Sequence, residues 1–142
     1  MIRIGILGCG RIGQVHAGTL NGMDNAKVVT VSDFMPAAAD KLAKTCNADV
    51  RTTDEIIACH DIDAVVIGTP TDTHFGIIQA AAQAGKAIFC EKPVDMSADN
   101  IRKLIGVVKS SGVAFFTAFN RRFDPNFANV QKRIIAGEIG SV

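Results

Sequence analysis

The stretch Ile4-Gly5-Ile6-Leu7-Gly8-Cys9-Gly10-Arg11-Ile12-Gly13 decides the fold of this chain. Residues 2–7 form an apolar run rich in β-branched side chains, which predicts a buried strand. Residues 12–22 then repeat apolar side chains at helical spacing, which predicts a helix. Three glycines with the spacing GxGxxG stand between these two elements, and a strand, such a turn and a helix are typical of a dinucleotide-binding unit.

Each glycine of this turn has its own purpose. Gly8 permits the tight turn, Gly10 lets the backbone approach a pyrophosphate, and Gly13 lets helix and strand pack closely. Free N–H groups where the helix starts, at Arg11 and Ile12, are expected to meet the phosphates with help from the helix dipole. The alternative, a glycine turn that binds nothing, is disfavoured by the elements on either side of the motif.

An acidic residue at the expected distance strengthens this interpretation. Asp33 lies 20 residues beyond Gly13, at the end of a second predicted strand at 26–33, where a carboxylate accepts hydrogen bonds from ribose hydroxyls. A carboxylate repels a 2′-phosphate, and the next residue is Phe34 rather than an arginine. We therefore expect NAD rather than NADP. Arg11 weakens the inference, since it could touch a phosphate or simply lie on the surface.

The rest of the chain alternates between helical and strand patterns. Helices are expected at 36–46, from residue 53 or 54, and at 73–84, 98–111 and 126–136; strands are expected at 49–52, 64–68, 87–90 and 113–117. Such alternation requires a parallel sheet covered on both faces. The sequence thus predicts an α/β Rossmann fold, a doubly wound parallel sheet of about six strands with helices on both faces.

Composition excludes several classes of partner. The 15 basic and 14 acidic side chains leave a net charge of +1, so nothing favours nucleic acid or an anionic membrane. No run approaches the ~20 apolar residues of a membrane span. The four cysteines, Cys9, Cys46, Cys59 and Cys90, have the spacing of neither a zinc site nor a disulfide framework. We therefore expect free thiols, no metal and a cytoplasmic location.

A second group of candidates follows the strand at 64–68. In open α/β sheets, ligands lie beyond the carboxyl ends of the strands, so Thr69 and Pro70 should line the cofactor cleft. Thr71 and Asp72 are candidates for cofactor contact and equally for capping the next helix. His74 falls in the first turn of that helix; it is counted with the cofactor-binding residues, although packing or hydrogen bonding is the plainer interpretation.

A third group, Glu91-Lys92-Pro93, follows the strand at 87–90. Pro93 restricts Lys92 to extended conformations. A lysine held there could enter the cleft, polarise a substrate hydroxyl and stabilise the alkoxide that forms as hydride leaves. Spacing alone favours a surface salt bridge instead.

These pieces together resemble the N-terminal domain of the Gfo/Idh/MocA oxidoreductases, and within that family the inositol 2-dehydrogenases. The resemblance covers essentially the whole chain. It rests on the glycine stretch with His16, and on Thr69-Pro70-Thr71-Asp72-Thr73-His74, Ala84-Gly85-Lys86, Glu91-Lys92-Pro93 and Asn120-Arg121-Arg122-Phe123-Asp124-Pro125.

The resemblance implies roles for particular residues. Lys92 would be the active-site lysine of the family, close to the nicotinamide and to the reacting hydroxyl. Glu91 and the segment 69–71 would contact the cofactor. Asn120 and Arg121 would lie at the cleft between two domains, with the cofactor-binding residues.

The resemblance also divides the chain. Residues 1–120 would form the NAD(P)-binding Rossmann domain, and residues 121–142 a connecting helix and the start of a missing C-terminal domain for substrate binding and oligomerisation. In the family that second domain supplies an Asp and a His that act with the lysine. We therefore expect a truncated, largely inactive chain from an NAD-dependent, homo-oligomeric dehydrogenase that takes hydride from a polyol or sugar hydroxyl.

Two other functions fit the same sequence. One is a non-catalytic NAD(H) sensor or corepressor, since the fold alone does not imply activity. The other is a sugar-modifying enzyme that reduces and regenerates NAD within one cycle and releases no NADH.

Overall fold

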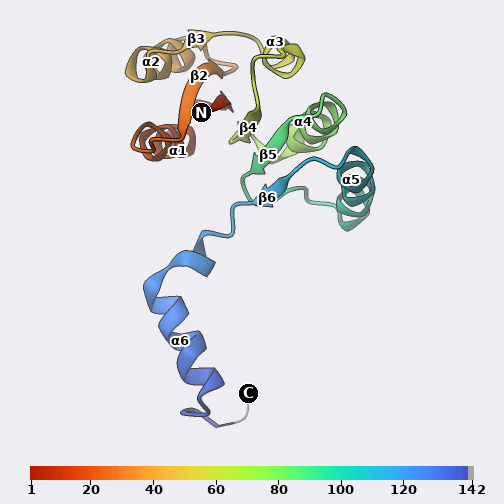
Figure 1. Ribbon diagram of the computed structural model, residues 1–142. Coiled ribbons are helices and arrows are strands. Elements are labelled where there is room, and N and C mark those ends of the chain that lie inside the picture. The colour runs from red at the N-terminus through yellow and green to blue at the C-terminus, as the bar shows by residue number, and fades with distance from the viewer. Residues whose placement is uncertain (141–142) are drawn as a thin grey trace.

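The computed structural model describes residues 1–140 and shows one parallel six-stranded sheet in the order β3-β2-β1-β4-β5-β6 (Figure 1). The strands are β1 (Ile2–Leu7), β2 (Ala26–Ser32), β3 (Asp49–Val50), β4 (Ala64–Ile67), β5 (Ala87–Cys90) and β6 (Phe115–Thr117). The helices are α1 (Arg11–Asn21), α2 (Pro36–Cys46), α3 (Thr53–Ala58), α4 (Thr71–Gln83), α5 (Ala98–Ser111), a 3₁₀ turn (Asn120–Phe123) and α6 (Pro125–Ile135). The predicted Rossmann fold is confirmed.

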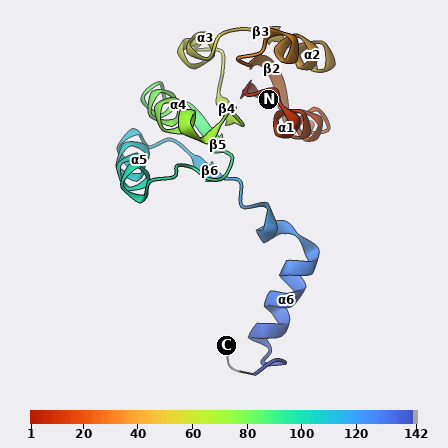
Figure 2. The same ribbon diagram turned by 180° about the vertical axis from the view of Figure 1, so that it is seen from behind.

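Helices cover both faces of this sheet, as the alternating pattern predicts. On one face, α1 and α2 bury small apolar side chains such as Ala17 and Ala39 against β1 and β2. On the other, α3, α4 and α5 pack over β4 and β5 through residues such as Ile56, Ile78 and Leu104 (Figures 1 and 2). The central strands are apolar along their length because both of their faces are covered.

The strand order reverses beside β1. From β1 the chain moves outward through β2 to β3, and then returns to place β4 on the other side of β1. The connections leaving the carboxyl ends of β1 and β4 therefore diverge, which opens a crevice there. This crevice holds the candidate site.

Several boundaries differ from the predicted ones. Helix α4 begins at Thr71, directly after Pro70, rather than at residue 73. Strand β3 ends at Val50 because Thr52 already caps α3. Strand β6 begins at Phe115 rather than 113, since Gly112 ends α5 in the left-handed conformation and the chain needs two more residues to reach the sheet.

The end of the chain leaves the domain. Helix α6 extends away from the sheet and contains no buried residue (Figure 1). It starts at Asp124, whose carboxylate accepts hydrogen bonds from the N–H groups of Asn126 and Phe127. Ser141 and Val142, the last residues of the segment expected to start a second domain, lie outside the described residues. Within residues 1–140, no helix combines the length and the apolar character needed to cross a bilayer.

Candidate functional site

The glycine turn is as tight as the sequence predicts. Gly8 has a φ of +96°, and a Cβ there would lie 2.6 Å from the carbonyl of Gly68. A Cβ on Gly13 would lie 2.0 Å from the Gly8 carbonyl oxygen. Gly10 differs, because a Cβ there would meet nothing within 4 Å. Gly8 and Gly13 are therefore required by the fold, whereas Gly10 leaves open space into which a ligand can approach.

The carboxylate of Asp33 is tied to this turn. Its Oδ2 accepts a hydrogen bond from the N–H of Cys9 at 2.6 Å, and its Oδ1 accepts one from the N–H of Met35 at 2.7 Å. A carboxylate has about four lone-pair sites, so each oxygen keeps capacity for a ribose hydroxyl. The neighbouring Phe34 is 97% exposed and offers no positive charge to a 2′-phosphate.

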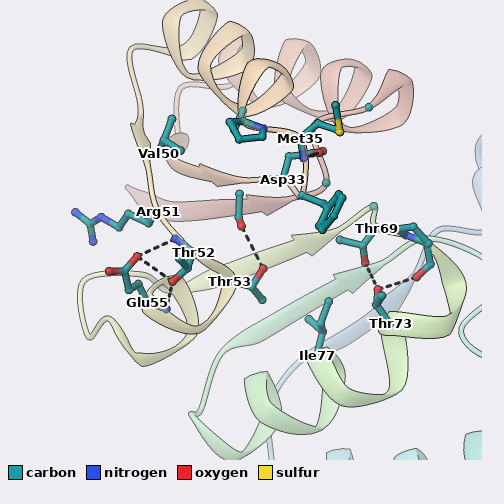
Figure 3. Close-up of a pocket in the computed structure, with 18 of the residues that line it drawn as sticks. Asp33, Met35, Val50, Arg51, Thr52, Thr53, Glu55, Thr69, Thr73 and Ile77 are labelled. Carbon is teal, nitrogen blue, oxygen red and sulfur yellow. Dashed lines mark hydrogen bonds between the residues drawn. The ribbon is translucent and has the colours of Figure 1, made fainter.

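An open cleft of about 1150 Å³ runs past the turn (Figure 3). Of the predicted cofactor-binding residues, it is lined by Gly8, Gly10, Asp33, Thr69 and Pro70. The structure thus brings together residues from the ends of β1, β2 and β4, which lie far apart in the sequence.

The helix after β4 is not capped as expected. Pro70 is the N-cap of α4, and no side chain caps it, so neither Thr71 nor Asp72 does so. Instead the Thr73 hydroxyl lies 2.7 Å from both the Pro70 carbonyl oxygen and the Thr69 hydroxyl (Figure 3). Thr73, which was not predicted as a site residue, therefore shapes the wall of the cleft.

The far wall of the cleft comes from the start of α3, which the sequence analysis did not include. Thr52 and Glu55 form a reciprocal capping box there, and the Thr53 hydroxyl lies 3.1 Å from that of Ser32 (Figure 3). Hydrogen bonds from the N–H and hydroxyl of Thr52 lower the pKa of Glu55. The capping motif is readable from the sequence, but its place in the cleft depends on the sheet order.

Two further residues of the turn lie beside the cleft. Arg11 is the exposed first residue of α1, where its side chain faces solvent. Ile12 is half-buried, and its Cγ2 lies 3.2 Å from where a Cβ on Gly68 would be. Both N–H groups belong to the first turn of α1, where helical N–H groups have no partner within the helix.

Cys9, within the turn, is a packing residue. It is fully buried, and its Sγ donates to the Ser32 carbonyl oxygen at 3.4 Å. Burial, with the nearby negative charge of Asp33, raises the pKa of the Cys9 thiol to about 12. The thiolate needed for nucleophilic chemistry is therefore not accessible here at neutral pH.

Lys92, Asn120 and Arg121 form a separate group beyond the carboxyl end of β5. Together they line a smaller cavity of about 410 Å³. All three are exposed, and Arg121 also lies 3.3 Å from a carboxylate oxygen of Asp124 and 5.0 Å above the Phe127 ring. The resemblance implies that Lys92 lies near the nicotinamide and that Asn120 and Arg121 lie at the cleft between two domains. In the structure the three line one cavity, which is separate from the main cleft.

Glu91 connects this group to α1, the helix that follows the glycine turn. Its Oε1 lies 2.8 Å from His16 Nε2 on α1, and its Oε2 accepts a hydrogen bond from the N–H of Lys92 at 3.2 Å. Both Glu91 and His16 are largely buried. His16 was part of the motif but was not predicted as a site residue, since a contact across 75 residues leaves no local signal.

The structure places His74 in the interior of the domain. The side chain is only 1% exposed, and each of its ring nitrogens lies within 3.0 Å of a backbone carbonyl oxygen. A ring so enclosed has no face open to a cofactor. The plainer interpretation from the sequence, a hydrogen-bonding residue of the interior, describes its position.

Residues 2–119 match the family described as "Oxidoreductase family, NAD-binding Rossmann fold". The chain is 51% identical over 141 residues to the inositol 2-dehydrogenase of Rhizobium meliloti (strain 1021), covering 99% of this chain and 43% of the relative. It is 40% identical to the scyllo-inositol 2-dehydrogenase (NAD(+)) of Bacillus subtilis (strain 168), covering 98% and 42%.

A solved structure shows the same similarity in three dimensions. The scyllo-inositol dehydrogenase of Lactobacillus casei with bound NAD(H) and scyllo-inositol superposes with a TM-score of 0.92 at 31% identity, over 99% of this chain and 43% of that one. The chain thus spans less than half the length of the curated relatives that it matches.

Proposed function

Because this chain belongs to the Gfo/Idh/MocA oxidoreductase family, we propose that it holds NAD for the transfer of hydride from a hydroxyl-bearing carbon of an inositol-like polyol. The observation that carries this proposal is that two candidate groups lie beyond the carboxyl ends of the parallel strands. The cleft with Gly10 and Asp33 follows β1 and β2, and the separate cavity lined by Lys92 follows β5. The relatives named as inositol dehydrogenases support the class of substrate.

The choice of NAD over NADP follows from the end of β2. Asp33 keeps lone pairs for ribose hydroxyls, and its charge repels a 2′-phosphate. Phe34 places no cation beside it. The solved relative with bound NAD(H) is consistent with this choice.

Each side chain has a defined part in the proposed reaction. NAD, when bound, accepts the hydride. The open backbone at Gly10 and the free N–H groups at the start of α1 hold the pyrophosphate. The Lys92 ammonium orients the substrate oxygen and offsets its developing negative charge. His74 is enclosed and His16 is paired with Glu91, so neither is free to take the hydroxyl proton.

The arrangement of the whole protein is also a proposal. We assign residues 1–120 to the NAD-binding domain and residues 121–142 to the connection with a second, substrate-binding domain. The exposed position of α6 and the greater length of the relatives support this division. Apolar side chains left exposed on α6, among them Phe127 and Ile135, favour a homo-oligomer in the complete protein. Free cysteines are compatible with the cytoplasm.

A chimera tests the proposed activity. This chain would replace the matching 43% of the Rhizobium meliloti inositol 2-dehydrogenase, and NADH formation would be followed with myo-inositol and scyllo-inositol. We expect the chimera to release NADH with at least one of them. Lys92→Met should lower kcat about 100-fold or more, because it removes the stabilising charge.

Matched controls give the result its meaning. Lys109→Met removes an exposed lysine of α5 and should leave kcat unchanged. A folded chimera that binds NAD yet oxidises neither inositol would contradict the proposed substrate class. Full activity of Lys92→Met would contradict the role given to Lys92.

A further inference from the structure

Two histidines reach the Glu91-Lys92-Pro93 segment from opposite faces of the sheet. His16 comes from α1, which packs on the same face as α2. His74 comes from α4, which packs on the other face with α5. Each contacts a residue directly beside Lys92, so that the lysine stands between two fixed neighbours.

The contact of His16 is with a side chain. Its Nε2 lies 2.8 Å from Glu91 Oε1, and its ring packs edge-on against Phe89 at 5.1 Å between centroids. The other oxygen of the Glu91 carboxylate accepts the N–H of Lys92. The carboxylate is therefore shared between α1 and the backbone of Lys92, and the two hydrogen bonds fix where the lysine leaves the sheet.

The contacts of His74 are with backbone carbonyls. Nδ1 lies 3.0 Å from the Pro93 carbonyl oxygen, and Nε2 lies 2.9 Å from the Thr69 carbonyl oxygen. Carbonyl oxygens only accept hydrogen bonds, so the ring donates where it carries a proton. His74 thus lies between two carbonyls, one in the loop after β4 and one in the loop after β5, and sets the distance between the two loops.

The end of β5 also contacts the His74 ring, because the Cys90 Sγ lies 3.5 Å from Nδ1. Burial and the neighbouring Glu91 raise the pKa of this thiol to about 12, so it stays uncharged. Helix α5, which packs along α4, buries the apolar Leu104.

We propose that His16 and His74 are positioning residues that brace the Lys92 segment from the two faces of the sheet. The bridge from Thr69 to Pro93 then joins the wall of the dinucleotide cleft to the lysine segment. Its importance for catalysis rests on the proposed function, whereas its geometry does not.

Conservative variants test the brace. At position 74, Asn keeps a donor near Nδ1, toward Pro93, and Gln keeps one near Nε2, toward Thr69. At position 16, Gln keeps a donor toward Glu91 and Ala does not. We expect the backbone amide signals of Glu91 and Lys92 to stay in place in H74N and H16Q, and to shift or broaden in H74Q and H16A.

The pattern of rescue separates positioning from general stability. Equal spectra for H74N and H74Q, or for H16Q and H16A, would overturn the brace. Because no cofactor is present, a chain that shows the expected pattern but binds no NAD would leave the brace standing and contradict only the proposed function.

Discussion

The three glycines of the turn, Gly8, Gly10 and Gly13, differ in what a side chain at each would touch. The sequence predicts a separate purpose for each, and the structure gives these purposes a steric basis. Gly8 and Gly13 lie against backbone atoms, whereas Gly10 faces empty space. A side chain at Gly10 would therefore hinder only the approach of the ligand, whereas a side chain at Gly8 or Gly13 would disturb the fold.

Alanine substitutions should separate these purposes. Gly13→Ala forces a Cβ onto a backbone oxygen and should cost ~1–3 kcal/mol of unfolding free energy in urea titrations. Gly10→Ala should fold normally but weaken NAD binding about tenfold or more, which is ~1.4 kcal/mol, because a methyl group blocks the pyrophosphate. Gly18→Ala, in an open position of α1, is the control and should stabilise by ~0.5–1 kcal/mol. Unchanged NAD affinity in Gly10→Ala would contradict the assigned role.

Two buried thiols make the free energy of unfolding depend on pH. Burial raises the pKa values of the Cys9 and Cys90 thiols to about 12 in the folded state, from the ordinary thiol value of 9.0. The folded state therefore holds these protons more tightly than the unfolded state. The stability that they contribute is complete below pH 9 and is lost as the pH rises toward 12.

We expect the free energy of unfolding to fall above pH 9, and the fall to be shallower in the Cys9→Ala/Cys90→Ala double variant. Denaturant titrations between pH 8 and about 11 would measure both slopes. Cys59→Ala, at a less buried thiol, is the control. Parallel curves for the double variant and the unchanged chain would contradict the prediction.

Helices and strands were largely predictable, because their signals are local. The glycine turn, the apolar run of β4 and the glycine after α5 fix most boundaries to within two residues. Contacts between elements were not predictable. The bond from Cys9 to Asp33 and the bridge from His74 to Pro93 join residues distant in the sequence, whose meeting depends on the sheet order.

Lys86 is another such contact, at the opposite end of the sheet from the site. Its side chain is 5% exposed, and its Nζ donates to the carbonyl oxygens of Cys59 at 2.6 Å and Ile62 at 2.8 Å. These hydrogen bonds hold the carboxyl end of α3 beside the start of β5. It therefore belongs to the fold rather than to the cofactor site.

Lys86→Met keeps the length of the side chain and removes the ammonium donor from both carbonyls, so that the Cys59 carbonyl keeps only the N–H of Ile62 at 3.2 Å. We expect a loss of ~1–3 kcal/mol in the free energy of unfolding, with NAD affinity unchanged. Lys109→Met, at an exposed position, should change neither quantity. A large loss of NAD affinity in a folded Lys86→Met variant would show that this end of the sheet is coupled to the cleft.

At the scale of the whole molecule, the described residues divide into a packed domain and a projecting helix. The family match ends at residue 119, and α6 buries no residue. Both observations predict that the sheet and its covering helices form the cooperative unit.

A chain shortened to residues 1–124 should therefore keep its unfolding free energy to within ~0.5 kcal/mol, since helix α6, which the shortening removes, contains no buried residue. It should also self-associate less than the complete chain in sedimentation velocity, because Phe127, Val130 and Ile134 are gone. Loss of folding in the shorter chain would contradict the division.

The most direct test of the central claim is a calorimetric titration of this chain with NAD and, separately, with NADP. We expect NAD to bind at least about tenfold more tightly than NADP, a difference of ~1.4 kcal/mol. Asp33→Ala should remove most of that difference, since it removes the carboxylate that accepts from ribose and repels phosphate. Equal or tighter binding of NADP, or a folded chain that binds neither, would contradict the assignment of the Asp33 cleft to NAD.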